Sequence, residues 1–144
     1  VAAGAGMVLG GHLVADPQRS VRVAAAGFGV AALVALLLGL GTWSAWTVLG
    51  LFAAMGFGAG IAGPSRDLLV RRAATSRFGQ AAYGRVYGFV YSGLDTGLAL
   101  APLVFGGLMD GGRFAAVLVG IAALWSLSIV TALGVGGVIR QVAA

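Results

Sequence analysis

The chain has 144 residues, of which 60% are hydrophobic and only 9% are charged, and its mean hydropathy is +1.02. These values lie outside the range of soluble globular domains and indicate an integral membrane protein. The net charge of +5 comes from arginines in short segments between apolar runs, which is the positive-inside pattern of a membrane protein and argues against a nucleic-acid-binding surface.

The apolar runs predict one partial and four complete membrane helices. Residues 1–14 are apolar except for His12. Because about 20 residues are needed to cross the hydrocarbon core, we expect this run to be the end of a helix that begins upstream. Complete spans are expected at 21–40, 46–63, 86–109 and 114–139. Irregular backbone in lipid would leave amide groups without hydrogen bonds, so the predicted fold class is an all-α integral membrane protein.

The connections between these spans differ in charge. Residues 15–22 form a short turn with two arginines, and 64–85 form a long loop with five. Within this loop the i,i+4 spacing of Asp67 and Arg71 predicts a short amphipathic helix. The turn after the first complete span carries two tryptophans and no charge, as is typical of the interface on the side that arginine avoids.

The distribution of arginines predicts the topology. Eight of them fall on one side of the predicted spans and Arg113 alone falls on the other. The positive-inside rule therefore predicts that loops 15–22 and 64–85 and the C-terminus are cytoplasmic.

Asp95 is the acidic residue whose position is least expected. It lies ten residues beyond Arg85, which places it about 15 Å into a hydrocarbon core of about 30 Å. An ionised acid at this depth costs about 2.5–3.5 kcal/mol. Asp95 is therefore either a group that carries a proton or contacts substrate, or a structural group that stays protonated or pairs with a neighbour such as Tyr91.

Small residues recur along two of the spans. Gly56 and Gly60 lie in the span 46–63, and the segment that enters and forms the span 86–109 contains Gly84, Gly88, Gly93, Gly97 and Pro102. Such residues predict close helix packing in a membrane. In the span 86–109 they also allow a helix that slides or bends against a neighbour.

The remaining polar residues give little support to an enzyme. His12 is either a proton carrier or a hydrogen-bonded structural group, and the hydroxyls of the last span are expected to bond back to their own helix. The sequence contains no nucleophile elbow, P-loop, zinc or heme signature. We therefore expect neither catalysis nor a cofactor.

Together these features resemble the C-terminal part of a major facilitator superfamily transporter, from the end of the eighth helix through the twelfth. The resemblance rests on the spacing of spans and loops, on the glycine and proline ladder, and on the first turn. Gly11, Asp16 and Arg19 match the glycine, aspartate and arginine of a loop signature of that superfamily. One extra residue precedes Asp16, and Pro17 stands where a basic residue is usual. The gating-loop candidates on this basis are Gly11, Asp16, Arg19 and Arg85.

The resemblance implies a partial six-helix bundle of an efflux-type protein that moves a small solute by alternating access, with proton coupling. It implies a missing N-terminal helix bundle and membrane lipid as partners, and a bacterial inner (plasma) membrane location. Span 46–63 would line the central cavity, 86–109 would lie at the bundle interface, and 21–40 and 114–139 would face lipid. The alternative is a small four-helix structural or regulatory membrane subunit. The first residue, which is Val and not Met, and the half-helix at 1–14 favour the transporter.

Overall fold

The computed structural model describes residues 1–13 and 17–143, with side chains at positions 17, 18, 76, 77, 82 and 135–143 left out of the description. The described residues are helical apart from short turns: α1 (Ala2–Leu13), α2 (Pro17–Leu40), α3 (Ala45–Phe78), the 3-10 helix η1 (Gln80–Ala82), α4 (Tyr83–Asp110) and α5 (Phe114–Ala143). Four of these helices, α2 to α5, are long and apolar enough to cross a membrane. The all-α fold class that the sequence predicts is therefore confirmed, and the four long apolar helices are compatible with a multi-pass membrane protein.

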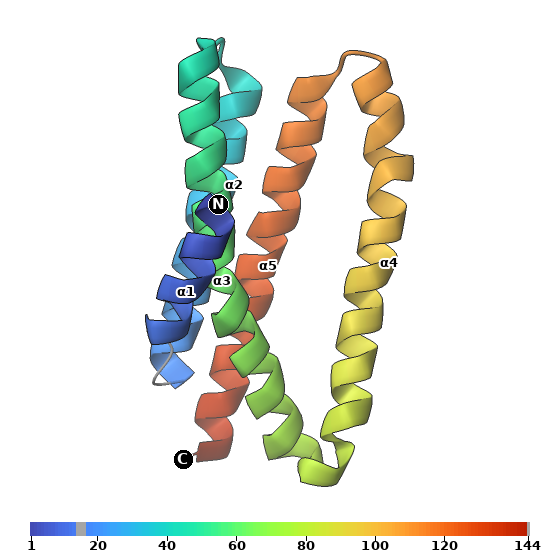
Figure 1. Cartoon of the computed structure of the whole chain (residues 1–144). Coiled ribbons are helices and arrows are strands. Elements are labelled where there is room, and N and C mark those ends of the chain that lie inside the picture. The colour runs from blue at the N-terminus through green and yellow to red at the C-terminus, as the bar shows by residue number, and fades with distance from the viewer. Residues whose placement is uncertain (14–16, 144) are drawn as a thin grey trace.

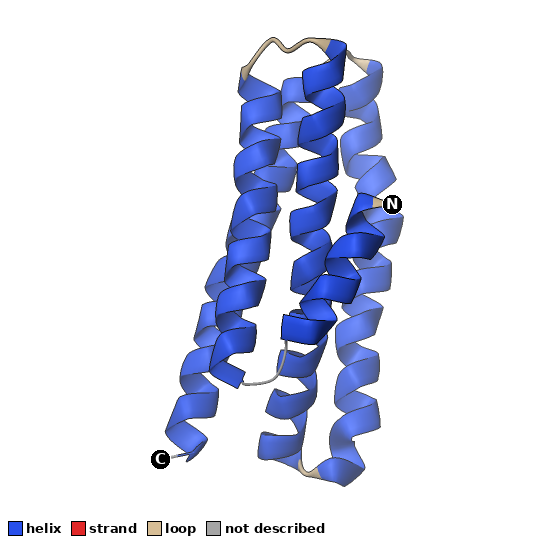
Figure 2. Ribbon diagram, turned by 60° about the vertical axis from the view of Figure 1, so that its left-hand side comes forward, coloured by secondary structure: helices blue, strands red, loops and turns tan. Residues whose placement is uncertain are grey.

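The long helices run side by side, with their connecting turns gathered at the two ends of the molecule (Figures 1 and 2). α2 packs against both α3 and α5, and the short α1 packs against α3. α4 contacts only α3, η1 and α5 among the described helices. In Figure 1 it stands at the edge of the group, joined to α3 at the lower end and to α5 at the upper end.

Local sequence signals explain three of the helix ends, two on α3 and one on α4. The Ser44 side chain accepts a hydrogen bond from the Thr47 amide and caps the start of α3. Gly79, with φ of 75°, ends α3 in a left-handed conformation that favours glycine. After α4, the Arg113 amide donates to the Leu108 carbonyl oxygen and the Gly112 amide donates to that of Met109. This pair of bonds, with Gly112 at φ 69°, is a Schellman motif.

The structure corrects the expected loop at 64–85. α3 continues through Pro64 to Phe78, so the connection to α4 is reduced to Gly79 and η1. A proline in a helix removes one backbone hydrogen bond and bends the helix without always ending it. The lower part of α3 leans away from α2 toward the base of α4 (Figure 1). The helix predicted around Asp67 and Arg71 is thus part of α3, and Asp67 pairs with Arg66 at 3.0 Å in place of Arg71.

Small side chains form most of the packed interior. Alanine is the commonest buried residue among the described residues of α2, and Ala24, Ala31 and Ala35 have no exposed surface at all. Leu69 of α3 packs with Val21 and Ala24 of α2 in a hydrophobic cluster, and the partly buried Phe28 packs against it. Because lipid supplies no hydrophobic drive for helix association, such small residues stabilise the bundle by letting backbones approach closely.

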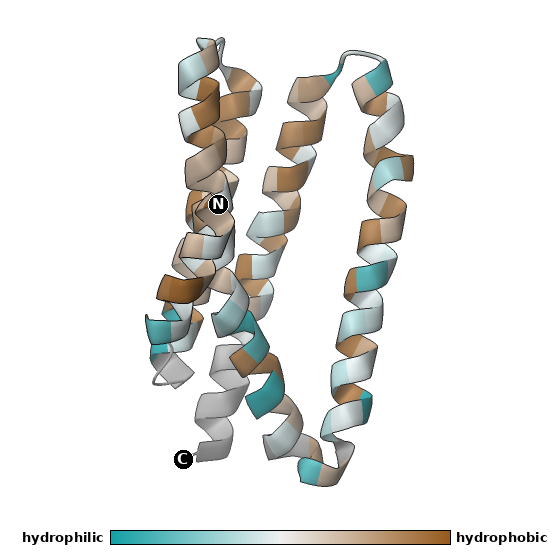
Figure 3. Ribbon diagram, viewed as in Figure 1, coloured by the Kyte–Doolittle hydropathy of each residue, from teal (hydrophilic) through white to brown (hydrophobic). Residues whose placement is uncertain are grey.

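Apolar and polar residues separate along the long axis. Figure 3 shows apolar colour over the upper parts of α2, α3 and α5 and hydrophilic colour in the lower part of α3. Arg19 and Arg22 lie near the start of α2, Arg71 and Arg72 in the last third of α3, and Arg85 near the start of α4. Arg113 lies in the turn between α4 and α5, which is at the upper end in Figure 1. The arginines of the described chain therefore gather toward one end, as expected from the sequence.

Candidate functional site

Most of the predicted site residues lie on α4, and α4 is the least covered of the long helices. None of its described residues is buried. Large apolar side chains along it, such as Phe89, Leu98 and Leu103, are 81%, 66% and 77% exposed. A helix of membrane length with so little protein around it presents its side chains to lipid or to another helix.

Three tyrosines form a ladder along the first half of α4. Tyr83, Tyr87 and Tyr91 are one helical turn apart, with ring centroids separated by 5.3 Å and then by 4.3 Å. The hydroxyl of Tyr87 donates a hydrogen bond of 2.7 Å to the hydroxyl of Tyr91. The i,i+4 spacing that places three residues on one helix face was present in the sequence, but only Tyr91 was singled out from it.

The charged stretch of α3 faces the lower end of this ladder. The guanidinium of Arg71 lies 5.9 Å from the ring centroid of Tyr83, within the range of a cation–π interaction. The tyrosine ladder therefore extends from the arginine-rich end of the molecule toward the middle of α4.

Asp95 lies one turn beyond Tyr91 and is exposed. Within the described residues it makes no hydrogen bond and no ion pair. The suggested pairing with Tyr91 is wrong in this structure, because the Tyr91 hydroxyl meets Tyr87. Long side chains on a helix point back toward its N-terminus, which directs Tyr91 toward Tyr87 and away from Asp95. An unpartnered carboxyl near the middle of a membrane helix is a candidate functional group, able to contact a substrate or to pair with a group from outside the described chain.

The structure does not bring the gating-loop candidates together. Asp16 lies outside the described residues. Gly11 is exposed near the end of α1, with open space where a side chain would be. Arg19, at the start of α2, and Arg85, at the start of α4, make no hydrogen bond or ion pair with the described part of the chain, and α2 does not contact α4. Their gating role stays a prediction.

The small residues of α3 and α4 lie in different surroundings. A Cβ atom on Gly60 would overlap the backbone of Ala3, and one on Gly56 would touch that residue at 3.8 Å. Gly60 thus lies directly against α1. By contrast, the glycines of this set on α4 have open space where a Cβ would be; they are Gly84, Gly88, Gly93 and Gly97. Pro102, on the same helix, is exposed. The described helices therefore make no close packing contact at these glycines.

Two further polar features agree with the structural roles expected from the sequence, in which these side chains bond within their own helix. His12 makes a hydrogen bond of 2.8 Å between its Nδ1 and the Val8 carbonyl oxygen, one turn earlier in α1. The hydroxyls of Ser126, Ser128 and Thr131 donate to carbonyl oxygens of α5 itself. These side chains are occupied by local bonds.

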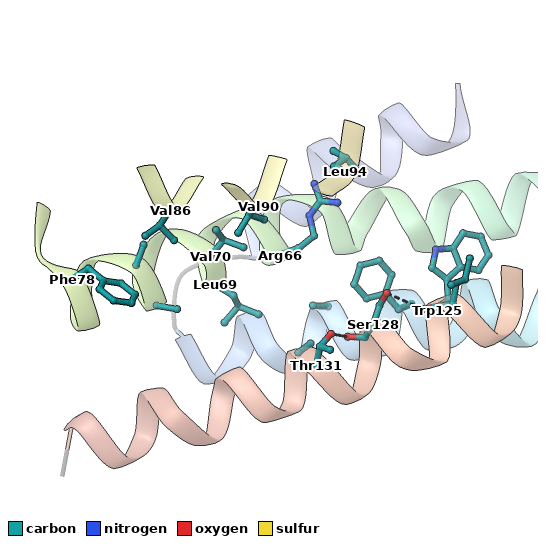
Figure 4. A pocket seen from close by; sticks show the side chains of 16 residues that line it. Arg66, Leu69, Val70, Phe78, Val86, Val90, Leu94, Trp125, Ser128 and Thr131 are labelled. Carbon is teal, nitrogen blue, oxygen red and sulfur yellow. Dashed lines mark hydrogen bonds between the residues drawn. The ribbon is translucent and has the colours of Figure 1, made fainter. Parts of the chain in front are cut away.

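A cavity of about 590 Å³ lies between α4 and the other long helices (Figure 4). Its α3 wall consists of Arg66, Leu69, Val70, Ala73, Ala74 and Phe78. Its remaining walls include Ala24 and Phe28 of α2, Val86, Val90 and Leu94 of α4, and Trp125 and Ser128 of α5. Asp95 and the tyrosine ladder are not part of its lining. The sequence could not predict this cavity, because it depends on how α4 is placed relative to three other helices.

Comparison of the chain with protein-family models, with curated proteins and with solved structures found no match.

Proposed function

We propose that the chain forms the C-terminal membrane helices of a secondary transporter of the major facilitator type, which moves a small solute by alternating access. The proposed transporter is of the efflux type and is coupled to protons. The observation that supports this proposal best is the placement of Asp95, an acid without a partner in the described residues on a helix without a buried residue.

The free-energy cost of an ionised acid in mid-membrane is the physical basis of the proposal. An ionised aspartate in mid-membrane costs about 2.5–3.5 kcal/mol, and acids at this depth are usually found facing a bundle interior or a water-filled cavity. Lipid can cover the apolar side chains of α4, but it does not solvate a carboxylate. A facing helix bundle that closes a water-accessible cavity over Asp95 would supply the missing environment, and it is the partner that a transporter of this type requires.

The packing of α4 is compatible with alternating access. α4 has few packing neighbours and is bounded by two glycines with left-handed φ, Gly79 and Gly112. Such positions can absorb changes in backbone direction between rigid helices. In contrast, α2 is packed between α3 and α5 through fully buried alanines. We infer that α4 changes its position relative to the group formed by α1, α2, α3 and α5.

The proposed location is the inner membrane of a bacterium, with the arginine-rich end of the bundle in the cytoplasm. Arginines close to membrane helices are retained on the cytoplasmic side, and the described arginines gather toward the end where α3 meets α4. The proposed partners are membrane lipid, an N-terminal helix bundle and a small-molecule substrate.

The second candidate is a structural or regulatory subunit, for which the exposed face of α4 would be the docking surface. The complete reading frame separates the two. A transporter predicts six to eight further apolar spans upstream of residue 1. A start codon just upstream, preceded by a stop codon, would overturn the transporter proposal and leave the subunit.

A further inference from the structure

The cavity beside α4 is long and apolar. Three residues of its α4 wall, Val86, Val90 and Leu94, follow one another at four-residue spacing, so this wall extends over about 12 Å. Phe78 lies at one end of the cavity and Trp125 at the other (Figure 4). The volume of about 590 Å³ is within the usual range of about 300–1,000 Å³ for sites that hold an organic molecule. The cavity therefore suits an extended molecule that lies parallel to the helices.

The charge in the cavity wall is balanced. Among the described residues of the lining, Arg66 alone is charged, and its Nε and Nη2 donate to Oδ1 of Asp67 at 3.1 and 3.0 Å. An anionic occupant would have to compete with Asp67 for the guanidinium, and a cationic one would be repelled by it. Because a charge without a counter-charge is expensive in apolar surroundings, the wall favours an uncharged molecule.

The hydroxyls in the wall are already used as donors. Ser128 donates to the Leu124 carbonyl oxygen at 3.0 Å, and Thr131 donates to the Ser128 carbonyl oxygen at 2.9 Å. Both protons are therefore bonded within α5. The side-chain N–H groups that the lining can offer to an occupant are those of Arg66 and Trp125.

These N–H groups call for an acceptor. A guanidinium carries five N–H groups, and the two bonds to Asp67 leave three of them. The indole Nε1 of Trp125 makes no hydrogen bond with the described part of the chain. Arg66 extends beside Leu94, in the half of the cavity toward Trp125 (Figure 4). Since N–H groups without an acceptor cost free energy away from water, an occupant with an oxygen atom at this end is favoured over a pure hydrocarbon.

We propose that the cavity binds an uncharged lipophilic molecule, with an acceptor oxygen such as a ketone oxygen bonded to Arg66. The molecule enters from the hydrocarbon core, because the α4 wall has no buried residue and the surrounding helices are long and apolar enough to cross a membrane. Arg66 lies level with Leu94, the neighbour of Asp95, and therefore near mid-membrane, far from the lipid head groups. An acyl chain would bring only hydrocarbon to Arg66. This inference requires a membrane but does not depend on transport.

Trp125 provides a direct reporter for the test. Replacing every other tryptophan by Phe, including Trp43→Phe and Trp46→Phe, leaves Trp125 as the single tryptophan in the protein. The protein is placed in phosphatidylcholine vesicles, and para-bromobenzophenone is added as a neutral ketone whose bromine quenches tryptophan fluorescence. The matched probe is para-bromodiphenylmethane, which has the same rings and bromine but no oxygen. We expect saturable quenching by the ketone at about a tenfold lower membrane concentration, as for one hydrogen bond to a charged donor.

Two charged relatives of the ketone test the selection against ions. Benzophenones that carry the same bromine and either a carboxylate or a quaternary ammonium group should each need about a tenfold higher membrane concentration than the neutral ketone. A preference of Trp125 for the anionic probe would overturn the inference, because Asp67 would then not hold the guanidinium.

Matched variants assign the hydrogen bond to Arg66. Arg66→Leu combined with Asp67→Leu removes the donor and its counter-charge together, and should raise the concentration needed for the ketone to that of the hydrocarbon probe. Asp110→Leu combined with Arg113→Leu, at the far end of α4, removes the same two charge types and should leave the preference unchanged. A preference for the ketone that survives the change at Arg66 would contradict the proposed bond.

Filling the cavity tests the location without removing a charge. Val90→Phe should weaken quenching by both neutral probes, while Val104→Phe, at a position of α4 that does not line the cavity, should not. Unsaturable quenching that is insensitive to Val90→Phe would overturn the inference. So would quenching by chain-brominated phosphatidylcholine that unbrominated benzophenone does not relieve, which would show a lipid chain in the cavity. These results leave the upstream reading frame unaffected, so failure here is distinct from failure of the proposed function.

Discussion

Gly27 of α2 and Gly58 of α3 lie so close together that neither has room for a side chain. A Cβ atom on Gly27 would be 2.6 Å from the Gly58 carbonyl oxygen, and one on Gly58 would be 2.8 Å from that of Gly27. The obstruction is backbone on both sides, which cannot rotate away as a flexible side chain could. This contact therefore sets the distance between the two helices, and the small residues of α2 fill the remaining space.

The first prediction concerns this contact. Gly58→Ala should push α2 from α3 and lower the stability of the bundle by about 1–3 kcal/mol, the usual cost of overpacking. Gly50→Ala, on the same helix but with open space around it, is the matched control and should have little effect or a small stabilising one. Thermal unfolding in detergent measures both. Equal melting temperatures for the two variants would contradict the close approach of the backbones.

The sequence predicted the helices of this fold better than their packing. Each apolar run of sufficient length is a helix, because lipid leaves the backbone no other way to satisfy its amides. The continuation of α3 past Pro64 was not predicted, since a proline removes only one backbone bond and the neighbouring residues decide whether the helix ends. The sequence of α2 shows that Gly27 belongs to a face of small residues. It does not show which helix packs against this face, because helix pairing is not encoded locally.

The candidate site was predicted in part for the same reason. Asp95 could be found from its depth alone, which follows from the rise per residue of a helix. Tyr83 and Tyr87 could have been found from their spacing relative to Tyr91. The cavity and the position of Arg66 in its wall could not, since both depend on the tilt of α4 relative to α3 and α5.

The second prediction is the topology. A cysteine introduced at Gln80, in the turn between α3 and α4, and one at Gly111, in the turn between α4 and α5, should react with a membrane-impermeant maleimide from opposite sides of the membrane. Both positions are exposed, so reactivity reports sidedness. A cysteine at the buried Ala35 is the negative control. Labelling of both turns from the same side would remove α4 from the set of spanning helices.

The third prediction concerns Arg71. Together with Arg72 it is expected to anchor the end of α3 at the anionic leaflet with about 1 kcal/mol each, and its contact with Tyr83 adds about 0.5–1 kcal/mol. Arg71→Gln should therefore loosen the junction of α3 and α4 more than Arg72→Gln does. Limited proteolysis between residues 79 and 82 measures the difference. Equal cleavage rates in the two variants would leave the cation–π contact without a role.

The fourth prediction concerns Asp95 and applies to the transporter of which the chain would be a part. Asp95→Asn keeps the shape of the side chain and most of its hydrogen-bonding capacity but removes the titratable proton. If Asp95 carries a proton or contacts substrate, transport or its dependence on a pH gradient should fall about tenfold or more, as expected for a functional intramembrane acid. The amount of folded protein should stay the same or rise, since the variant relieves a burial cost of about 2.5–3.5 kcal/mol.

The two structural roles of Asp95 predict different results. An acid that is permanently protonated predicts near-normal transport for Asp95→Asn, because Asn makes similar contacts. An acid that is ionised and paired predicts loss of folded protein, because its partner is left uncompensated, and that partner would have to lie beyond the described residues. The measurement is proton-gradient-driven transport normalised to membrane-inserted protein. Asp110→Asn, at the exposed end of the same helix, is the control. Wild-type activity and pH dependence in Asp95→Asn would exclude Asp95 from the mechanism.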